Sequence, residues 1–235
     1  MKANALVTIP PYAQFLGEVL KHPVVEGLRL NTVMPMVEGK LEEKLEQLSA
    51  ACHEEKKELW IDLKCRQLQV KSFGLPPFTE IELTHQLSVD TPVTAYFSDG
   101  KESATVLEVY GNKLIMQEGP KRVIGPGESV NIPHSSLKIE GFFTETDEKY
   151  IEAAKKVGLH NYMLSFVEQS SDIEELLKRD PQAKIVAKIE SHKGLGYVAE
   201  NWKNESRLMA ARGDLYVEMN KPHEIIAAVE SIIKK

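Results

Sequence analysis

Two ionisable residues interrupt an apolar run in the segment KIVAKIES (184–191). The residues around Lys188 and Glu190 are those of a strand that is covered on both faces. Because strand side chains alternate between faces, Lys188 and Glu190 point to the same side of the sheet. Two buried charges are costly unless they pair or meet a ligand. A lysine in such a place could neutralise an enolate or a transferring phosphoryl group.

The other segments with strand-like patterns also end in polar or charged residues. In a parallel α/β fold the carboxyl ends of the strands meet at one edge, where ligands bind. An ion pair or a helix cap would explain any one of these residues, but their shared position at successive strand ends favours a ligand site. Glu190 and Asp214 could offer two carboxylate oxygens to a hard cation such as Mg²⁺. The residues at the strand ends are Arg29 with Asn31, Asp62 with Lys64, Ser165, Lys188 with Glu190, and Arg212 with Asp214.

Alternating strands and helices must position these residues, and they make up most of the chain. Short apolar runs predict strands, and apolar residues three and four apart predict helices. The six resulting β–α units predict a parallel sheet, either doubly wound or closed as a barrel. The expected strands are 5–9, 27–31, 59–63, 162–166, 184–190 and 207–211, and the expected helices are 12–21, 40–55, 144–158, 170–180 and 221–235.

The chain changes character after the third strand, where short strands alternate with turns and no helical pattern occurs. Ser98-Asp99-Gly100 and Tyr110-Gly111-Asn112 have compositions typical of hairpin turns. We therefore expect two domains. An α/β domain is made of residues 1–66 and 132–235, and an all-β domain, residues 67–131, is inserted into it.

Composition narrows the class of protein. The 235 residues are 42% hydrophobic and 27% charged, as in an ordinary globular protein. A net charge of −6 argues against nonspecific binding of nucleic acid. No apolar segment approaches the roughly 20 residues of a membrane span, and the first residues have no signal-peptide pattern. The two cysteines are too few for a disulfide framework. We expect a cytoplasmic protein that is not bound to a membrane.

The segment KIVAKIES, followed by LMAARGDLYVEM, resembles the core of the pyruvate kinase family, in which a K-I-E strand precedes a strand leading into A-R-G-D-L. GLRLN, WIDLK, SDGKESATVLEV with SVNIP, and LSFVEQSSDIEEL resemble further family segments in the same order. The resemblance implies a pyruvate-kinase-like (β/α) barrel with a small β-barrel domain inserted after strand three. It also implies an incomplete barrel of about six βα units, because the last two barrel strands and the C-terminal regulatory domain of the family have no counterpart here.

The family pattern implies a role for each matching residue. Lys188 would stabilise the enolate of pyruvate and contact the phosphoryl group, and Arg29 would contact phosphoryl oxygens. Ser165 would line the substrate pocket. The backbone of a turn at the start of a short helix would receive the substrate carboxylate. This turn is formed by Ala211, Arg212 and Gly213.

The resemblance also implies two kinds of cation. Glu190 and Asp214 would hold a divalent cation, Mg²⁺ or Mn²⁺. Asn31 and Asp62 would help to seat a monovalent cation, which is K⁺ in the family. Two further ligands of that cation are missing, because apolar residues stand two positions after Asn31 and one position after Asp62. These apolar residues are Val33 and Leu63. The implied K⁺ site is therefore incomplete.

The groups that contact the nucleotide in the family are replaced. The family segment G-P-E-I-R is Cys65-Arg66-Gln67-Leu68-Gln69 here, so Gln69 takes the place of an arginine and Arg66 is the nearest basic residue. Glu128 and Ser129 stand where the family has a lysine before V-N. The enolpyruvate and metal half of the site is kept, whereas the nucleotide half is eroded.

These features favour a protein that binds Mg²⁺ with pyruvate or phosphoenolpyruvate. They point to a pyruvate-kinase-like phosphotransferase with weak or no use of ADP. Two alternatives stay open: a lyase or aldolase that acts on pyruvate enolate, and a non-catalytic homologue that serves as a sensor or scaffold. We expect a homo-oligomer, or a partner chain that completes the barrel, because an open strand edge invites pairing.

Overall fold

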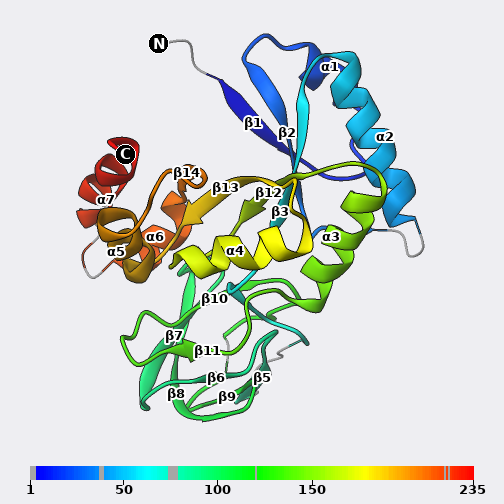
Figure 1. Cartoon of the computed structure of the whole chain (residues 1–235). Coiled ribbons are helices and arrows are strands. Elements are labelled where there is room, and N and C mark those ends of the chain that lie inside the picture. The colour runs from blue at the N-terminus through cyan, green and yellow to red at the C-terminus, as the bar shows by residue number, and fades with distance from the viewer. Residues whose placement is uncertain (1–3, 37–39, 74–78, 120, 220, 222) are drawn as a thin grey trace.

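The larger of two lobes is built on a parallel sheet of six strands in the order β1-β2-β3-β12-β13-β14 (Figure 1). This computed structural model describes residues 4–36, 40–73, 79–119, 121–219, 221 and 223–235. The strands are β1 (Ala5–Ile9), β2 (Val25–Asn31), β3 (Glu58–Leu63), β12 (Asn161–Leu164), β13 (Lys184–Ile189) and β14 (Arg207–Ala210). Strands that pair in chain order belong to a barrel, since the order reverses in a doubly wound sheet. The sheet curls without closing: in the described residues β1 and β14 each pair with one neighbour. The predicted incomplete barrel is confirmed.

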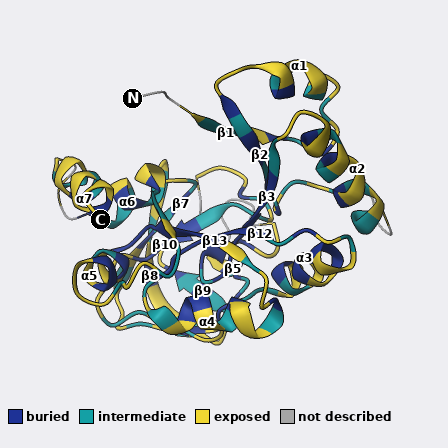
Figure 2. Ribbon diagram, turned by 45° about the horizontal axis from the view of Figure 1, so that its top comes forward, coloured by how far each residue is buried: buried dark blue, intermediate teal, exposed yellow. Residues whose placement is uncertain are grey.

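Helices pack along the outer face of this sheet with their buried residues turned inward (Figure 2). They are α1 (Leu16–Lys21), α2 (Leu41–Glu54), α3 (Glu145–Lys156), α4 (Ser170–Arg179), α5 (His192–Glu200) and α7 (Glu224–Ile233). A further short helix, α6 (Arg212–Glu218), begins at the carboxyl end of β14 and lies next to α7 and β10 (Ser129–Asn131). Residue 222 of the expected last helix lies outside the described residues. None of the described helices is long and apolar enough to span a membrane.

The central strands β3, β12 and β13 are buried on both faces, which explains their nearly continuous apolar sequences. The main core lies between the sheet and the helices, where Leu28, Ile61 and Ile189 are fully buried. A smaller cluster of Trp60, Met163 and Val186 fills the inner side of the curl. The strands are therefore held from both sides, and their carboxyl ends form a fixed edge.

The smaller lobe is an antiparallel sheet with the strand order β4-β10-β7-β8-β9-β5, inserted after β3 as predicted. Its edge strands meet through backbone hydrogen bonds from Lys71 to Glu82 (2.8 Å) and from Thr84 to Gln69 (2.9 Å), so the sheet closes into a small barrel. The predicted turns at 98–100 and 110–112 connect the strands of two hairpins, β7 with β8 and β8 with β9. The backbone reverses there through positive φ angles at Ser98, Asp99, Gly100 and Gly111. The strands of this sheet are β4 (Leu68–Gln69), β5 (Glu80–Glu82), β7 (Val93–Phe97), β8 (Glu102–Tyr110), β9 (Lys113–Met116) and β10 (Ser129–Asn131). Two short strands, β6 (Leu87–Ser88) and β11 (Lys138–Ile139), form a separate pair.

A buried carboxylate joins the two ends of the insertion. Asp147, the third residue of α3, accepts hydrogen bonds from the backbone N–H groups of Lys64 (2.8 Å) and Cys65 (2.9 Å). It also caps its own helix with Thr144. β11 pairs with β6, so antiparallel pairing continues beyond residue 131 to Ile139. The boundaries at 66/67 and 131/132 stay a prediction.

Candidate functional site

Most of the residues singled out by the sequence line one cavity between the strand ends and the small β-barrel. The cavity has a volume of about 1010 Å³. The parallel sheet brings them together because Asn31 lies opposite Asp62 in the register, and Lys188 lies opposite Met209. The larger lobe contributes Arg29, Asn31, Lys64, Lys188, Glu190, Ala211, Arg212, Gly213 and Asp214 to the lining. Asp62 and Ser165 lie beneath this surface and are fully buried.

Asp62 is the centre of a cluster of three cations. Its Oδ2 atom lies 2.5 Å from Arg29 Nη2 and 3.0 Å from Lys64 Nζ, and its Oδ1 atom lies 3.1 Å from Lys188 Nζ. Burial opposes the charge on Asp62, but the three cations outweigh it and hold the pKa of this carboxyl well below its usual range. Asp62 is therefore ionised and fixes the direction of all three basic side chains.

Lys188 is buried, and its ammonium group meets three oxygen atoms. Nζ donates to Ser165 Oγ at 2.8 Å and to Asp62 Oδ1 at 3.1 Å, and it lies 3.1 Å from Glu190 Oε1. Burial alone would lower the pKa of Lys188, but the carboxylates of Glu190 and Asp62 raise it above the usual lysine value. Lys188 therefore remains positively charged, which suits a group that neutralises developing negative charge rather than a base.

Glu190 is a buried carboxylate with spare capacity for a cation. Its Oε2 atom accepts from the N–H of Phe166 at 2.8 Å, while Oε1 has the Lys188 ammonium, 3.1 Å away, as its one polar neighbour among the described residues. Burial raises the pKa of Glu190 to about 7, even though the ammonium of Lys188 acts in the opposite direction. The charge on Glu190 is thus only partly balanced by the protein.

Asp214 lies in the first turn of α6 and lines the same cavity. Gln67 Nε2 and Asn131 Nδ2 donate to its Oδ1 atom at 3.3 and 3.4 Å. Burial also raises the pKa of Asp214. Glu190 and Asp214 thus bring two poorly balanced carboxylates to one cavity, and carboxylate oxygens are the ligands that a hard divalent cation takes. Among the described residues, at this cavity or outside it, no group of three or more His, Cys, Asp or Glu side chains could hold a metal, so the protein offers two carboxylates here.

Asn31 and Asp62, the residues predicted to seat a monovalent cation, lie opposite each other on β2 and β3. The side-chain oxygen of Asn31 accepts from the N–H of Val33 at 3.2 Å. The Asp62 side chain is already engaged by three basic partners, Arg29, Lys64 and Lys188. The monovalent-cation site stays a prediction.

The small β-barrel brings a different set of groups to the cavity. Gln69 Nε2 donates to the carbonyl of Gly127 at 3.2 Å. Glu128 accepts from the N–H of Gly125, from Ser98 and from Arg122, whose Nη2 lies 2.6 Å away. Despite partial burial, these contacts lower the pKa of Glu128 to about 2.

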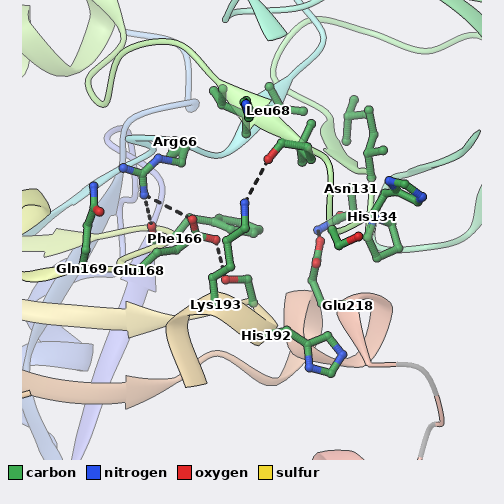
Figure 3. A pocket seen from close by; sticks show the side chains of 18 residues that line it. Arg66, Leu68, Asn131, His134, Phe166, Glu168, Gln169, His192, Lys193 and Glu218 are labelled. Atoms are coloured by element: carbon green, nitrogen blue, oxygen red, sulfur yellow. Dashed lines mark hydrogen bonds and ion pairs between the residues drawn. The ribbon is translucent and has the colours of Figure 1, made fainter. Parts of the chain in front are cut away.

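Arg66 lies away from this cavity. Its guanidinium forms a two-point contact with Asp172, at 2.9 and 2.6 Å, and lies over the ring of Phe142. Arg66 lines a second cavity of about 880 Å³ (Figure 3). It is therefore not placed to replace the basic residue that the sequence lacks at Gln69.

Sequence reasoning missed Gln67 and Asn131 as partners of Asp214. Both residues lie in segments that resemble the family, Gln67 in Cys65-Arg66-Gln67-Leu68-Gln69 and Asn131 in SVNIP. The sequence feature that could have indicated this contact is the presence of one amide side chain at each end of the insertion. Such a pair can hold a carboxylate only if the ends lie side by side.

A family model described as the barrel domain of pyruvate kinase matches residues 79–235, which is well over half of the chain. The chain belongs to the pyruvate kinase family. Among curated relatives, the pyruvate kinase of Borreliella burgdorferi is 32% identical over 126 residues, 52% of this chain and 26% of the relative. Pyruvate kinase 1 of Saccharomyces cerevisiae is 30% identical over 145 residues, 60% of this chain and 29% of the relative.

The pyruvate kinase of Thermotoga maritima is also similar, with 31% identity over 148 residues, 60% of this chain and 31% of the relative. The match thus spans less than a third of each of these pyruvate kinases. It supports the family and the fold, and the predicted resemblance is confirmed at that level. The activity of whole pyruvate kinases is carried to this chain only as a proposal.

Proposed function

We propose that this member of the pyruvate kinase family binds a divalent cation, Mg²⁺ or Mn²⁺, together with pyruvate or phosphoenolpyruvate. The observation that carries the proposal is the convergence of Lys188, Glu190 and Asp214 on one cavity at the strand ends. A buried ammonium group beside two poorly balanced carboxylates matches a substrate that carries negative charge and a metal ion together.

Each side chain has a definite task in this proposal. The Lys188 ammonium, held by Ser165 and Asp62, would face the enolate oxygen or the phosphoryl group. Arg29, fixed by Asp62 and by Thr8 (3.2 Å), would contact phosphoryl oxygens. Glu190 and Asp214 would hold the divalent cation, which would polarise the oxygen atoms of the substrate when bound. The backbone of Ala211, Arg212 and Gly213 would receive the substrate carboxylate.

The test is calorimetric titration of Mn²⁺ in the presence of oxalate, which resembles pyruvate enolate in shape and charge. We expect wild-type protein to bind and the double variant Glu190→Gln with Asp214→Asn to bind at least about a hundredfold more weakly, since contacts to charged groups contribute about 1.5–3 kcal/mol each. Glu174→Gln, which removes an exposed carboxylate from α4, is the matched control. Equal affinity in wild type and in the double variant would refute the site.

Use of ADP is a separate question. Gln69 and Glu128 offer no cation where the family has two, although Lys101 and Arg122 also reach the cavity. We propose weak or absent transfer of phosphate from phosphoenolpyruvate to ADP. A coupled assay measures this transfer, and exchange of the methyl protons of pyruvate in heavy water, followed by NMR, measures enolate chemistry without a nucleotide.

A non-catalytic role as a sensor or scaffold is the second candidate, and the pairing of Arg122 with Glu128 favours it. Because this pair neutralises a cation that faces the cavity, phosphate binding is weakened. Binding of Mn²⁺ and oxalate with neither proton exchange nor phosphate transfer would identify a sensor. Proton exchange without phosphate transfer would point instead to a lyase or aldolase of pyruvate enolate.

Self-association is a further part of the proposal. β1 and β14 are the edges of the parallel sheet, and in the described residues each has an unpaired side. Open edges of this kind favour pairing with another chain. Sedimentation equilibrium of the 235-residue polypeptide at micromolar concentration should show an oligomer, and a single monomeric species would contradict this expectation.

A further inference from the structure

Two buried amides from the segments that join the lobes both donate to Asp214. Gln67 lies between β3 and β4, where the chain enters the small β-barrel, and Asn131 is the last residue of β10, where it leaves. Both reach the same carboxylate oxygen, Oδ1. Their exposed fractions are 7% and 2%. One oxygen of Asp214 is thus held from both linking segments at once.

The pairing of β4 with β10 explains why the two amides converge. Ser129 lies opposite Gln69, and Val130 lies opposite Leu68. Continuing this antiparallel register by one residue places Asn131 opposite Gln67. Directly opposite residues of an antiparallel pair point to the same face. Both amides therefore point toward α6 and its carboxylates.

Asn131 bridges two carboxylates of α6. Asp214 and Glu218 are four residues apart and share one face of the helix. Asn131 Nδ2 lies 3.2 Å from Glu218 Oε1, and Figure 3 shows these side chains pointing toward each other at the second cavity. Asp214 lines the first cavity, so Asn131 forms part of the wall between the two. Its own oxygen, Oδ1, is buried and has no hydrogen-bond partner among the described residues. The two carboxylates, rather than that oxygen, set the orientation of the amide.

We propose that Gln67 and Asn131 are positioning residues that orient Asp214 for a divalent cation and thereby couple the position of the small β-barrel to the metal site. This inference rests on the proposed function, because it takes Asp214 as a cation ligand. Oδ1 is engaged by the amides, while Oδ2 accepts no hydrogen bond from any described residue and is left for the cation. Movement of either linking segment would turn the ligand, and a bound cation would in turn hold both segments.

The first test is the affinity for Mn²⁺ in the presence of oxalate. Asn131→Ala should weaken binding by about tenfold, the effect of losing roughly one hydrogen bond to a charged group. Asn112→Ala is the matched control, since Asn112 donates to Glu82 and to the carbonyl of Leu83 within the small β-barrel. Its affinity should equal that of wild type. Gln67→Leu repeats the test from the other linking segment and replaces Asn131→Ala if that variant does not fold.

The second test separates positioning from a general loss of structure. In wild type, Mn²⁺ with oxalate should slow backbone hydrogen exchange in residues 66–70 and 128–132. In Asn131→Ala this slowing should disappear, although the folded lobes still exchange slowly. Wild-type affinity together with wild-type slowing in both variants would overturn the inference while leaving the metal site intact. Wild-type protein that binds no Mn²⁺ would refute the proposed function itself and this inference with it.

Discussion

The two walls of the main cavity are built in different ways. On the wall formed by the strand ends, Lys188 and Asp62 are almost fully buried and are fixed by several partners each. On the wall formed by the small β-barrel, the side chain of Arg122 is 43% exposed and is paired mainly with Glu128. The first wall is ordered by the protein alone, whereas the second is open to water.

This difference has an electrostatic reason. Charges on the strand ends interact through a protein interior, where attraction is strong and the loss of one partner leaves the others unbalanced. Charges on the small β-barrel are screened by solvent, and their pairs contribute little. Similar changes of charge should therefore have unequal effects on the two walls.

Lys188→Met should have the largest effect on stability. It leaves Asp62 and Glu190 buried without the ammonium between them, and breaking a buried ion pair costs about 3–5 kcal/mol of unfolding free energy. Enolate or phosphoryl chemistry should be lost as well. Urea unfolding at neutral pH measures the change. Lys184→Met removes an exposed lysine from the same strand and should cost at most about 0.5 kcal/mol. Equal losses in the two variants would contradict the contrast between buried and exposed charges.

Restoring basic groups to the other wall should have the next largest effect. The double variant Gln69→Arg with Glu128→Lys places a basic residue at both positions where the family has one. It also removes the carboxylate that pairs with Arg122. We expect ADP to bind about a hundredfold more tightly, given about 1.5–3 kcal/mol for each contact to phosphate. Calorimetry with ADP measures this, and Glu80→Lys on β5 controls for the added charge. Unchanged affinity in the double variant would mean that the open wall does not face the nucleotide.

Acidification should stabilise the protein through Glu218, which is linked to Asp214 through Asn131. Burial raises the pKa of Glu218 to about 7, although Asn131 favours its ionised form. Because the folded state then binds the proton more tightly than the unfolded state, this contribution is complete below the usual glutamate pKa and is lost as pH rises toward 7. Urea unfolding in the presence of EDTA should show a smaller drop in stability from pH 5 to pH 7.5 in Glu218→Gln than in wild type. Glu174→Gln should behave like wild type, and parallel pH profiles for Glu218→Gln and wild type would rule out this role of Glu218.

Arg122→Gln should have the smallest effect. The pair with Glu128 is close to solvent, so its loss should lower the unfolding free energy by about 0–1 kcal/mol. Urea unfolding measures this change in unfolding free energy, which can then be compared directly with the change for Lys188→Met. A loss as large as the one expected for Lys188→Met would show that the two walls do not differ.

The parallel sheet could be predicted because its central strands are buried on both faces and have continuous apolar sequences. Helix α5 was missed. Its sequence contains two glycines, which weaken a helical pattern. Gly194 is required by packing, since a Cβ atom there would lie 2.8 Å from the carbonyl oxygen of Val167. That contact is tertiary and leaves no local signal in the sequence.

The candidate site was predictable where it depends on local alternation. Lys188 and Glu190 were expected on one face because they are two residues apart in a strand, and their charged groups lie 3.1 Å apart. The contacts of Gln67 and Asn131 with Asp214 depend on the register between distant segments, which no local pattern reveals. Cys65 is another such case. It stands where the family has glycine, and it adopts a φ of 47° while its N–H is bound by Asp147.

The bonds from Asp147 to Lys64 and Cys65 bear on the order in which the chain folds. Pairing of β3 with β12 must close a long loop that contains the whole insertion. If the small β-barrel forms first, its paired ends shorten that loop roughly threefold, which lowers the entropic cost of closure by about 1 kcal/mol. Asp147 can then bind the two backbone groups with little further search. The folded insertion would thus hold the ends of β3 and α3 close together, and the parallel sheet would form after it.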